Sequence, residues 1–205
     1  MFVIKRVYSG KKIHLSFDDG PHSRNTKIIL DILERNNINA TFFVIGEKIK
    51  RNKDIIAMIY SGGHRIGCHL FQHYDMTTLS DRSIRNQIQM FENALSPFAP
   101  IDRILRPPYG AHSKRTDRIL HSMGYHILFW NVDTEDWKRH QGWVDFGMRQ
   151  IRNLNECLVL MHDIHYTTAN QLEKFIKEIK EIGDASFVDL EAITGIPKPN
   201  TITKI

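Results

Sequence analysis

Short apolar runs alternate with stretches of helical spacing along almost the whole chain. Runs of alternating or continuous apolar residues are typical of strands and occur at Ile13–Phe17, Thr41–Ile45, Arg65–Cys68, Ile101–Arg106, Tyr125–Trp130, Cys157–Met161 and Ser186–Leu190. Between them, apolar residues three and four positions apart predict helices over residues 28–33, 49–60, 80–95, 114–123, 142–154 and 169–182. Strands that alternate with helices predict a parallel α/β sheet of about seven strands.

The chain length and the absence of a glycine-rich nucleotide-binding motif narrow the choice of fold. The 205 residues fit one domain with a sizeable core, and no repeat, low-complexity tract or linker divides them. We therefore expect a single domain over residues 1–205. No G-x-G-x-x-G follows a strand, which disfavours a dinucleotide-binding fold. A barrel fits better, and its chemistry is expected at the carboxyl ends of the strands.

Charge and hydropathy exclude some partners. The net charge is +5, from 28 Lys plus Arg against 23 Asp plus Glu, and it is spread in mixed-sign stretches, so no nucleic-acid partner is expected. No apolar run approaches the length of a transmembrane segment. Residues 1–12 contain no apolar signal region. The protein is thus expected in the cytoplasm, or at the cell envelope or secreted if an export signal has been removed. The oligomeric state stays open.

Two adjacent carboxylates, Asp18 and Asp19, end the first predicted strand, and Gly20-Pro21 then predicts a turn. Within a strand, neighbouring side chains point to opposite faces, but at a strand end both can face one point. Two anions held close repel each other unless a cation lies between them. The stretch therefore indicates a metal, a nearby arginine or both, with a solvated Asx-type turn as the alternative.

His69 and His73 are four residues apart, so on one turn of helix they would share a face and could bind one ion. Two imidazoles and one carboxylate make a three-ligand site with an open position, as in catalytic zinc sites. Asp19 is the obvious third ligand. No carboxylate lies between the two histidines, so the general base must come from elsewhere, and Asp18 is available.

Arg106 and His162 also follow predicted strands. Arg106 precedes two prolines, so its guanidinium is carried on stiff backbone and could orient Asp18. A structural ion pair is the alternative. His162 follows a buried run, where a histidine is often a core residue; beside a carboxylate such as Asp133 it could act as a general acid.

Five motifs in order carry a resemblance to a known family. They are Phe17-Asp18-Asp19-Gly20-Pro21, His69-x-x-x-His73, Arg106-Pro107-Pro108-Tyr109-Gly110, Asp133-x-x-Asp136-Trp137 and Leu160-Met161-His162. Their order and spacing resemble those of the polysaccharide deacetylase family, the NodB-homology domain. The resemblance covers nearly the whole chain, and it implies a distorted (β/α) barrel with fewer strands than a full eight.

The resemblance implies hydrolysis of an N-acetyl group, in some relatives an O-acetyl group, on a sugar polymer by metal-activated water. Asp19, His69 and His73 would bind the metal, usually zinc, although cobalt or nickel can serve in relatives. Asp18 would be the base, and Arg106 would orient it.

The remaining motif residues would act on the substrate. The backbone N–H of Tyr109 would stabilise the oxyanion, and His162 would protonate the leaving amine. Asp133 would tune His162, while Asp136 would share a polar network with Arg106. The pocket for the acetyl methyl group would be walled by Trp137 and Leu160.

The sequence departs from the family beside the first histidine. Cys68 and Leu70 stand where the family usually has Asn and Ser or Thr, so His69 is expected to be held differently. The expected substrate is an N-acetylglucosamine-containing glycan: peptidoglycan, chitooligosaccharide or poly-N-acetylglucosamine. A catalytically silent carbohydrate-binding barrel and a metal-dependent amidase acting on a non-sugar substrate are the alternatives. Substrate choice is expected in loops such as residues 139–145 and 165–168.

Overall fold

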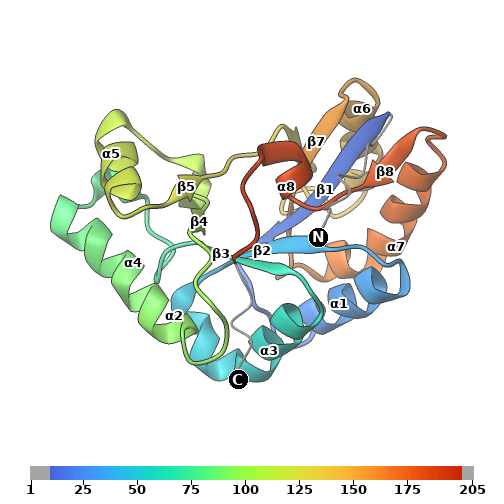
Figure 1. Ribbon diagram of the computed structural model, residues 1–205. Coiled ribbons are helices and arrows are strands. Elements are labelled where there is room, and N and C mark those ends of the chain that lie inside the picture. The colour runs from blue at the N-terminus through green and yellow to red at the C-terminus, as the bar shows by residue number, and fades with distance from the viewer. Residues whose placement is uncertain (1–9, 200–205) are drawn as a thin grey trace, which may run out of the picture.

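Parallel strands form one curled sheet, and the helices lie in an arc around its outer side (Figure 1). The computed structural model describes residues 10–199, so the predicted domain limits at 1 and 205 lie outside the described residues. Within this range the strands are β1 (Lys11–Asp18), β2 (Ala40–Val44), β3 (Arg65–Cys68), β4 (Ile104–Leu105), β5 (His126–Ile127), β6 (Val132–Asp133), β7 (Glu156–His162) and β8 (Ala185–Phe187).

The sheet order is β5-β4-β3-β2-β1-β7-β6, and every strand pair is parallel. Strand β1 is central: β7 pairs with one edge over residues 12–18. On its other edge β8 pairs with residues 11–13 and β2 with residues 15–18. The predicted parallel (β/α) barrel is confirmed, in a curled and open form.

The helices connect successive strands and cover the sheet. They are α1 (Asn25–Arg35), α2 (Gly46–Ile49), α3 (Lys53–Ser61), α4 (Asp81–Leu95), α5 (Lys114–Ser122), α6 (Trp143–Arg152), α7 (Tyr166–Lys180) and α8 (Glu191–Thr194). Short 3₁₀ turns lie at Lys50–Asn52, Met76–Thr78 and Pro108–Gly110. No helix of residues 10–199 is long and apolar enough to span a membrane.

The two faces of β1 have different chemistry. Ile13, Leu15 and Phe17 belong to the large apolar core between the sheet and the helices. His14, Ser16 and Asp18 alternate with them, so they face the inside of the curl, and all three are buried. A smaller apolar cluster that includes Phe43, Leu128 and Leu158 forms a separate core. The inner face of β1 therefore carries a row of polar side chains that ends at Asp18.

Two predicted elements differ from the structure. The single helix expected over residues 49–60 is broken at Asn52, which has non-helical φ −127° and ψ 31°. The strand expected over Tyr125–Trp130 keeps only the two residues of β5. Beyond it, the carbonyl groups of Leu128 and Phe129 accept hydrogen bonds from the Arg106 guanidinium rather than from another strand. Strand β6 was not predicted.

The helix predicted over residues 80–95 is confirmed as α4. Ser80 caps α4, where its hydroxyl accepts a hydrogen bond from the Ser83 N–H. Cys68 and Cys157 are both buried free thiols.

Candidate active site

A pocket of about 390 Å³ lies at the carboxyl ends of the strands. Arg106 and Asp136 are buried and do not line it, whereas every other predicted site residue does. The lining consists of Asp18, Asp19, His69, His73, Pro107, Tyr109, Gly110, Trp130, Asp133, Trp137, Leu160 and His162. Residues from the ends of six strands, far apart in sequence, therefore share one site.

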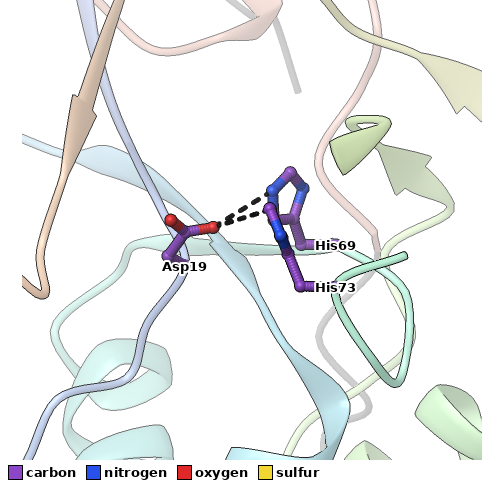
Figure 2. A group of neighbouring side chains, drawn as sticks. All are labelled: Asp19, His69 and His73. Carbon is purple, nitrogen blue, oxygen red and sulfur yellow. Dashed lines mark ion pairs between the residues drawn. The ribbon is translucent and has the colours of Figure 1, made fainter. Parts of the chain in front are cut away.

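Asp19, His69 and His73 converge on one point (Figure 2). Oδ1 of Asp19 lies 3.4 Å from Nε2 of His69 and 3.1 Å from Nε2 of His73. One ligand atom from each residue lies within 4.8 Å of the other two. The three predicted metal ligands are thus close enough to bind one ion.

Left-handed backbone conformations, and not a helical turn, bring these three side chains together. His69 and His73 were expected on one helical turn, but they lie in the loop after β3, where Leu70 has φ 61°. The loop is held instead by α2, whose Gly46 and Glu47 N–H groups donate to the carbonyls of Leu70 and Phe71. Asp19 likewise has φ 72°, which breaks the strand alternation after Asp18.

The contacts of these three residues test whether a cation fits. Nδ1 of His69 lies 2.7 Å from the carbonyl oxygen of Arg106, which can only accept, so Nδ1 carries the proton. In the neutral imidazole, Nε2 therefore presents a lone pair toward Asp19. Oδ1 of Asp19 is buried and has no hydrogen-bond donor among the described residues. Buried acceptors that face one another repel unless a cation lies between them, and this donor set suits zinc.

The electrostatics of Asp19 agree with this arrangement. Burial opposes ionisation of its carboxyl group, but positive charge facing it, from protonated His69 and His73 or from a cation in the same place, lowers its pKa. Asp19 is therefore a carboxylate at neutral pH, as a metal ligand must be.

Arg106 is fully buried and contacts Asp18 as predicted. Its Nη1 lies 2.7 Å from Oδ1 of Asp18 and 2.9 Å from Oγ of Ser16. Nη2 donates to the carbonyl of Phe129 at 3.1 Å. The guanidinium also lies 4.1 Å from the ring centroid of Phe43. Several fixed partners thus hold the guanidinium in one place, and it holds one carboxylate oxygen of Asp18.

His162 is paired with Asp136. Its Nδ1 lies 2.8 Å from Oδ1 of Asp136, and its backbone N–H donates to Oδ2 at 2.8 Å. Burial lowers the pKa of His162, but the hydrogen bond and charge of Asp136 outweigh burial and raise it to about 9. The imidazole is therefore protonated at neutral pH and can give up a proton in the pocket.

Comparison with known proteins assigns the chain to a family. The family model described as polysaccharide deacetylase matches residues 5–128, which is more than half of the chain. The chain belongs to the polysaccharide deacetylase family. Peptidoglycan-N-acetylglucosamine deacetylase PgdA of Listeria monocytogenes is 34% identical over 193 residues, which are 94% of this chain and 41% of that protein. The chain thus spans less than half the length of that relative.

Solved structures in this deacetylase family share the fold. The chitin deacetylase of the fungus Colletotrichum lindemuthianum is 28% identical, with a TM-score of 0.85 over 93% of this chain and 90% of that one. A pseudoenzyme of the CE4 family from Bacillus anthracis is also 28% identical, with a TM-score of 0.79 over 87% of this chain and 64% of that one. A similar fold therefore does not by itself distinguish active family members from inactive ones. That distinction depends on the side chains in the pocket.

Neither Asp133 nor Asp136 has its expected partner in this deacetylase-family chain. Asp133 was expected beside His162, but its Oδ1 accepts a hydrogen bond from the Glu135 N–H at 2.8 Å. Asp136 was expected in the network of Arg106, and it contacts His162 instead. The reason is position: Asp133 is still in β6, whereas Asp136 lies in the following turn, where its carboxylate reaches the end of β7.

The predicted substrate-facing residues lie on the pocket wall. Tyr109 has φ 60°, and its ring centroid lies 4.4 Å from the ring centroid of His73. Trp137 is half exposed, whereas Leu160 is buried. An exposed indole beside a buried aliphatic side chain leaves room for a small apolar group.

Sequence reasoning missed Thr168. It was grouped with a loop expected to choose the substrate, but it lies in α7, and its hydroxyl donates to Oδ2 of Asp136 at 2.5 Å. This contact fixes the carboxylate that holds His162. No local pattern in the sequence marks it, because the two residues are 32 positions apart.

Lys48 was missed as well. Three successive carbonyl groups of the turn after β1 each accept a hydrogen bond from a different element. The Asp163 N–H donates to Asp18 at 3.4 Å, Nζ of Lys48 to Asp19 at 2.7 Å, and the Ile45 N–H to Gly20 at 3.0 Å. Lys48 is the side-chain donor of the three, and it binds the carbonyl of a residue with left-handed backbone.

Gly20 has a steric reason to lack a side chain. A Cβ at this position would overlap the carboxylate of buried Asp163. That carboxylate accepts a hydrogen bond from the hydroxyl of Thr26 at 2.5 Å, and burial raises its pKa to about 7. The carboxylate of Asp163 is therefore packed closely against the turn that follows β1.

Proposed function

We propose that this protein hydrolyses N-acetyl groups from an N-acetylglucosamine-containing glycan, with a divalent metal ion held by Asp19, His69 and His73. The observation that carries the proposal is the meeting, in one pocket, of this ligand cluster with an arginine-held carboxylate and a protonated histidine. Amide hydrolysis needs an activated water, charge stabilisation and a proton for the leaving nitrogen. The pocket contains one candidate group for each requirement.

Zinc is the expected ion, and cobalt or nickel would also suit two imidazoles and a carboxylate. When bound, such an ion supplies the Lewis acidity that lowers the pKa of water to about 7. His69 would keep its orientation through Nδ1 and the Arg106 carbonyl.

Asp18 takes the proton of the attacking water in this proposal. Its Oδ2 lies 3.9 Å from Nε2 of His69, so its free oxygen is directed toward the ligand cluster. Its other oxygen is bound to Arg106, which keeps the carboxylate in one orientation as it gains the proton.

His162 donates its proton to the amine as the C–N bond breaks. Asp136 keeps the imidazolium charged and oriented before transfer. The Tyr109 N–H would stabilise the oxyanion, and the acetyl methyl would lie against Trp137 and Leu160. The products are free acetate and a glucosamine unit.

The substrate class is inferred from relatives. The named relatives act on peptidoglycan and chitin, and both contain N-acetylglucosamine. We propose the same class here, with poly-N-acetylglucosamine as a further member. Such polymers lie at the cell envelope or outside the cell, so this is where the protein is expected to act.

Acetate release tests the proposal. Chelator-treated protein would be assayed on chitooligosaccharides and peptidoglycan, before and after zinc, cobalt or nickel is restored. We expect release to stop with chelator and to return with metal, and Asp18→Ala to abolish it. Release from simple N-acetyl amides but not from any glycan would establish the non-sugar amidase instead. Stoichiometric zinc binding without release would support the catalytically silent carbohydrate-binding barrel.

A further inference from the structure

The three proposed metal ligands differ in what holds them. Nδ1 of His69 donates to the carbonyl of Arg106, and the backbone carbonyl of Asp19 accepts a hydrogen bond from Lys48. Among the described residues, no protein group accepts a hydrogen bond from Nδ1 of His73. A metal-binding imidazole is normally oriented by a hydrogen bond to its second nitrogen. The orientation of His73 must therefore come mainly from the placement of its backbone.

Two hydrogen bonds fix the backbone next to His73. The Tyr74 N–H donates to the Gln72 carbonyl at 2.8 Å, which closes a three-residue turn with His73 at its centre. The Gln72 N–H donates to Oε1 of Gln87 at 2.7 Å. Both backbone polar groups of Gln72 are thus hydrogen-bonded, and the second of these bonds connects the loop to helix α4.

Gln87 is the polar member of an otherwise apolar stripe. The buried side chains of α4 are those of Ile84, Gln87, Ile88, Phe91 and Leu95. A buried amide is costly unless its donor and acceptor are both hydrogen-bonded. Both bonds of this amide go to one residue, since Oε1 accepts from the Gln72 N–H and Nε2 donates to Oε1 of Gln72 at 3.2 Å. The polar group in this stripe therefore joins α4 to the loop that carries His73.

The rest of the loop between the two histidines is held by backbone contacts. Leu70 stands where the family usually has Ser or Thr, and its buried side chain cannot form a hydrogen bond. The carbonyls of Leu70 and Phe71 are bound by N–H groups of α2, which packs against α4 (Figure 1). The half of the loop beside His69 is thus held by α2, and the half beside His73 is held by Gln87.

We propose that Gln87 is a positioning residue for the metal site: by binding Gln72 it places His73, without touching the ion itself. This inference deepens the proposed function and rests on it for the presence of the ion. If Gln87 only stabilised the fold, its replacement would lower the melting temperature of the metal-free protein. If it positions His73, the replacement weakens metal binding instead, because an apolar side chain suits the rest of the stripe and the half-buried Gln72 N–H can bind water.

Zinc binding separates these two roles. Gln87→Met removes both hydrogen bonds and keeps an unbranched side chain, and Gln87→Leu is a second apolar variant. Gln89→Met is the matched control, because it makes the same change on the exposed face of the same helix. Calorimetric titration of zinc into chelator-treated protein should show binding weakened about tenfold in both Gln87 variants and unchanged in Gln89→Met. The melting temperature of the metal-free protein should not fall in any of the three.

Two further measurements test the contact itself. Gln87→Glu keeps an acceptor for the Gln72 N–H and, once the Gln72 amide turns its NH₂ group toward it, a second acceptor as well, so it should restore most of the zinc affinity. Amide hydrogen exchange of Gln72, measured without metal, should be faster in Gln87→Met than in the unsubstituted protein or in Gln89→Met.

The outcomes separate this inference from the proposed reaction. Equal zinc affinity in Gln87→Met and Gln89→Met, or unchanged exchange of the Gln72 amide, would overturn the role of Gln87. A lower melting temperature of metal-free Gln87→Met with zinc affinity intact would do the same. Weaker zinc binding in Gln87→Met, together with no acetate release by the zinc-loaded unsubstituted protein, would overturn the proposed reaction and leave the role of Gln87 standing.

Discussion

At the scale of single residues, the charge state of His162 depends on one carboxylate. Asp136 accepts hydrogen bonds from the imidazole, the backbone N–H of His162 and the hydroxyl of Thr168. The pKa of His162 is raised from its ordinary value of 6.5 to about 9 because this carboxylate outweighs the opposing effect of burial. The protonated form is therefore complete below pH 6.5 and is lost as the pH rises through about 9.

The variant Asp136→Asn should move the basic limb of the kcat–pH profile to lower pH. Without this carboxylate, burial is opposed only by the charges of Asp18 and Asp19, so the pKa of His162 should fall from about 9 toward its ordinary value. At pH 8 the protonated fraction, and with it kcat, should then fall, by up to roughly thirtyfold for a return to the ordinary value. A titration of the His162 ring by NMR measures the same shift directly.

Asp133→Asn is the matched control for this prediction, because Asp133 lines the same pocket but contacts the Glu135 N–H. Its basic limb should stay near that of the unsubstituted protein. A larger displacement in Asp133→Asn than in Asp136→Asn would contradict the pairing.

At the scale of elements, the turn after β1 is shaped by parts of the chain that lie beside it in space. Lys48 of α2 donates to the Asp19 carbonyl, so α2 supports this proposed metal ligand without contacting its side chain. Because partners behind a metal ligand fix its orientation, their loss weakens metal binding.

Lys48→Met should therefore weaken zinc binding about tenfold while it leaves the melting temperature of the metal-free protein nearly unchanged. Methionine keeps an unbranched side chain but has no donor. Calorimetric titration of zinc into chelator-treated protein is the measurement, and Lys48→Arg should restore part of the affinity. The control is Lys50→Met, which removes an exposed lysine nearby. Equal zinc affinity in Lys48→Met and Lys50→Met would refute the supporting role of Lys48.

Elements with strong local patterns could be predicted from the sequence, and contacts across the fold could not. The helix over residues 80–95 and the strand Arg65–Cys68 were predicted close to their observed positions because helical spacing and apolar runs are local patterns. The prediction that His69 and His73 share one helical turn was wrong. Leu70 between them is buried in a left-handed backbone conformation, and its carbonyl accepts a hydrogen bond from the Gly46 N–H, which is a contact across the fold.

The candidate site shows the same division. Order and spacing of the motifs predicted the convergence of Asp19, His69 and His73 and the contact of Arg106 with Asp18. They did not decide which aspartate reaches His162, because the two candidates are three residues apart and only the turn after β6 separates their directions.

At the scale of the whole molecule, the proposed metal ligands Asp19, His69 and His73 lie at the end of β1 and in the loop after β3, so a bound ion would link the two. An ion that binds only the folded state should stabilise the entire sheet through this link. At a free zinc concentration about 100 times the dissociation constant, the free energy of unfolding should rise by about 2.7 kcal/mol. For a chain of this size the melting temperature should rise by about 5–10 °C.

Thermal unfolding with zinc and with chelator measures this effect. His73→Ala removes one of the ligands and should reduce the shift to near zero without removing a core side chain, since His73 lies at the pocket. A shift as large in His73→Ala as in the unsubstituted protein would place the ion elsewhere.

The contacts of Arg106 have a consequence for how this family evolves. Its guanidinium joins the central strand β1 to the carbonyls that follow the edge strand β5, so it ties two distant parts of the sheet together through its side chain. Asp18 is its buried counter-ion, and losing either partner costs about 3–5 kcal/mol because the other is left charged and unpaired. Asp18, the proposed base, therefore also stabilises the fold. A lineage that no longer needed the reaction would still be selected, through folding alone, to retain both residues.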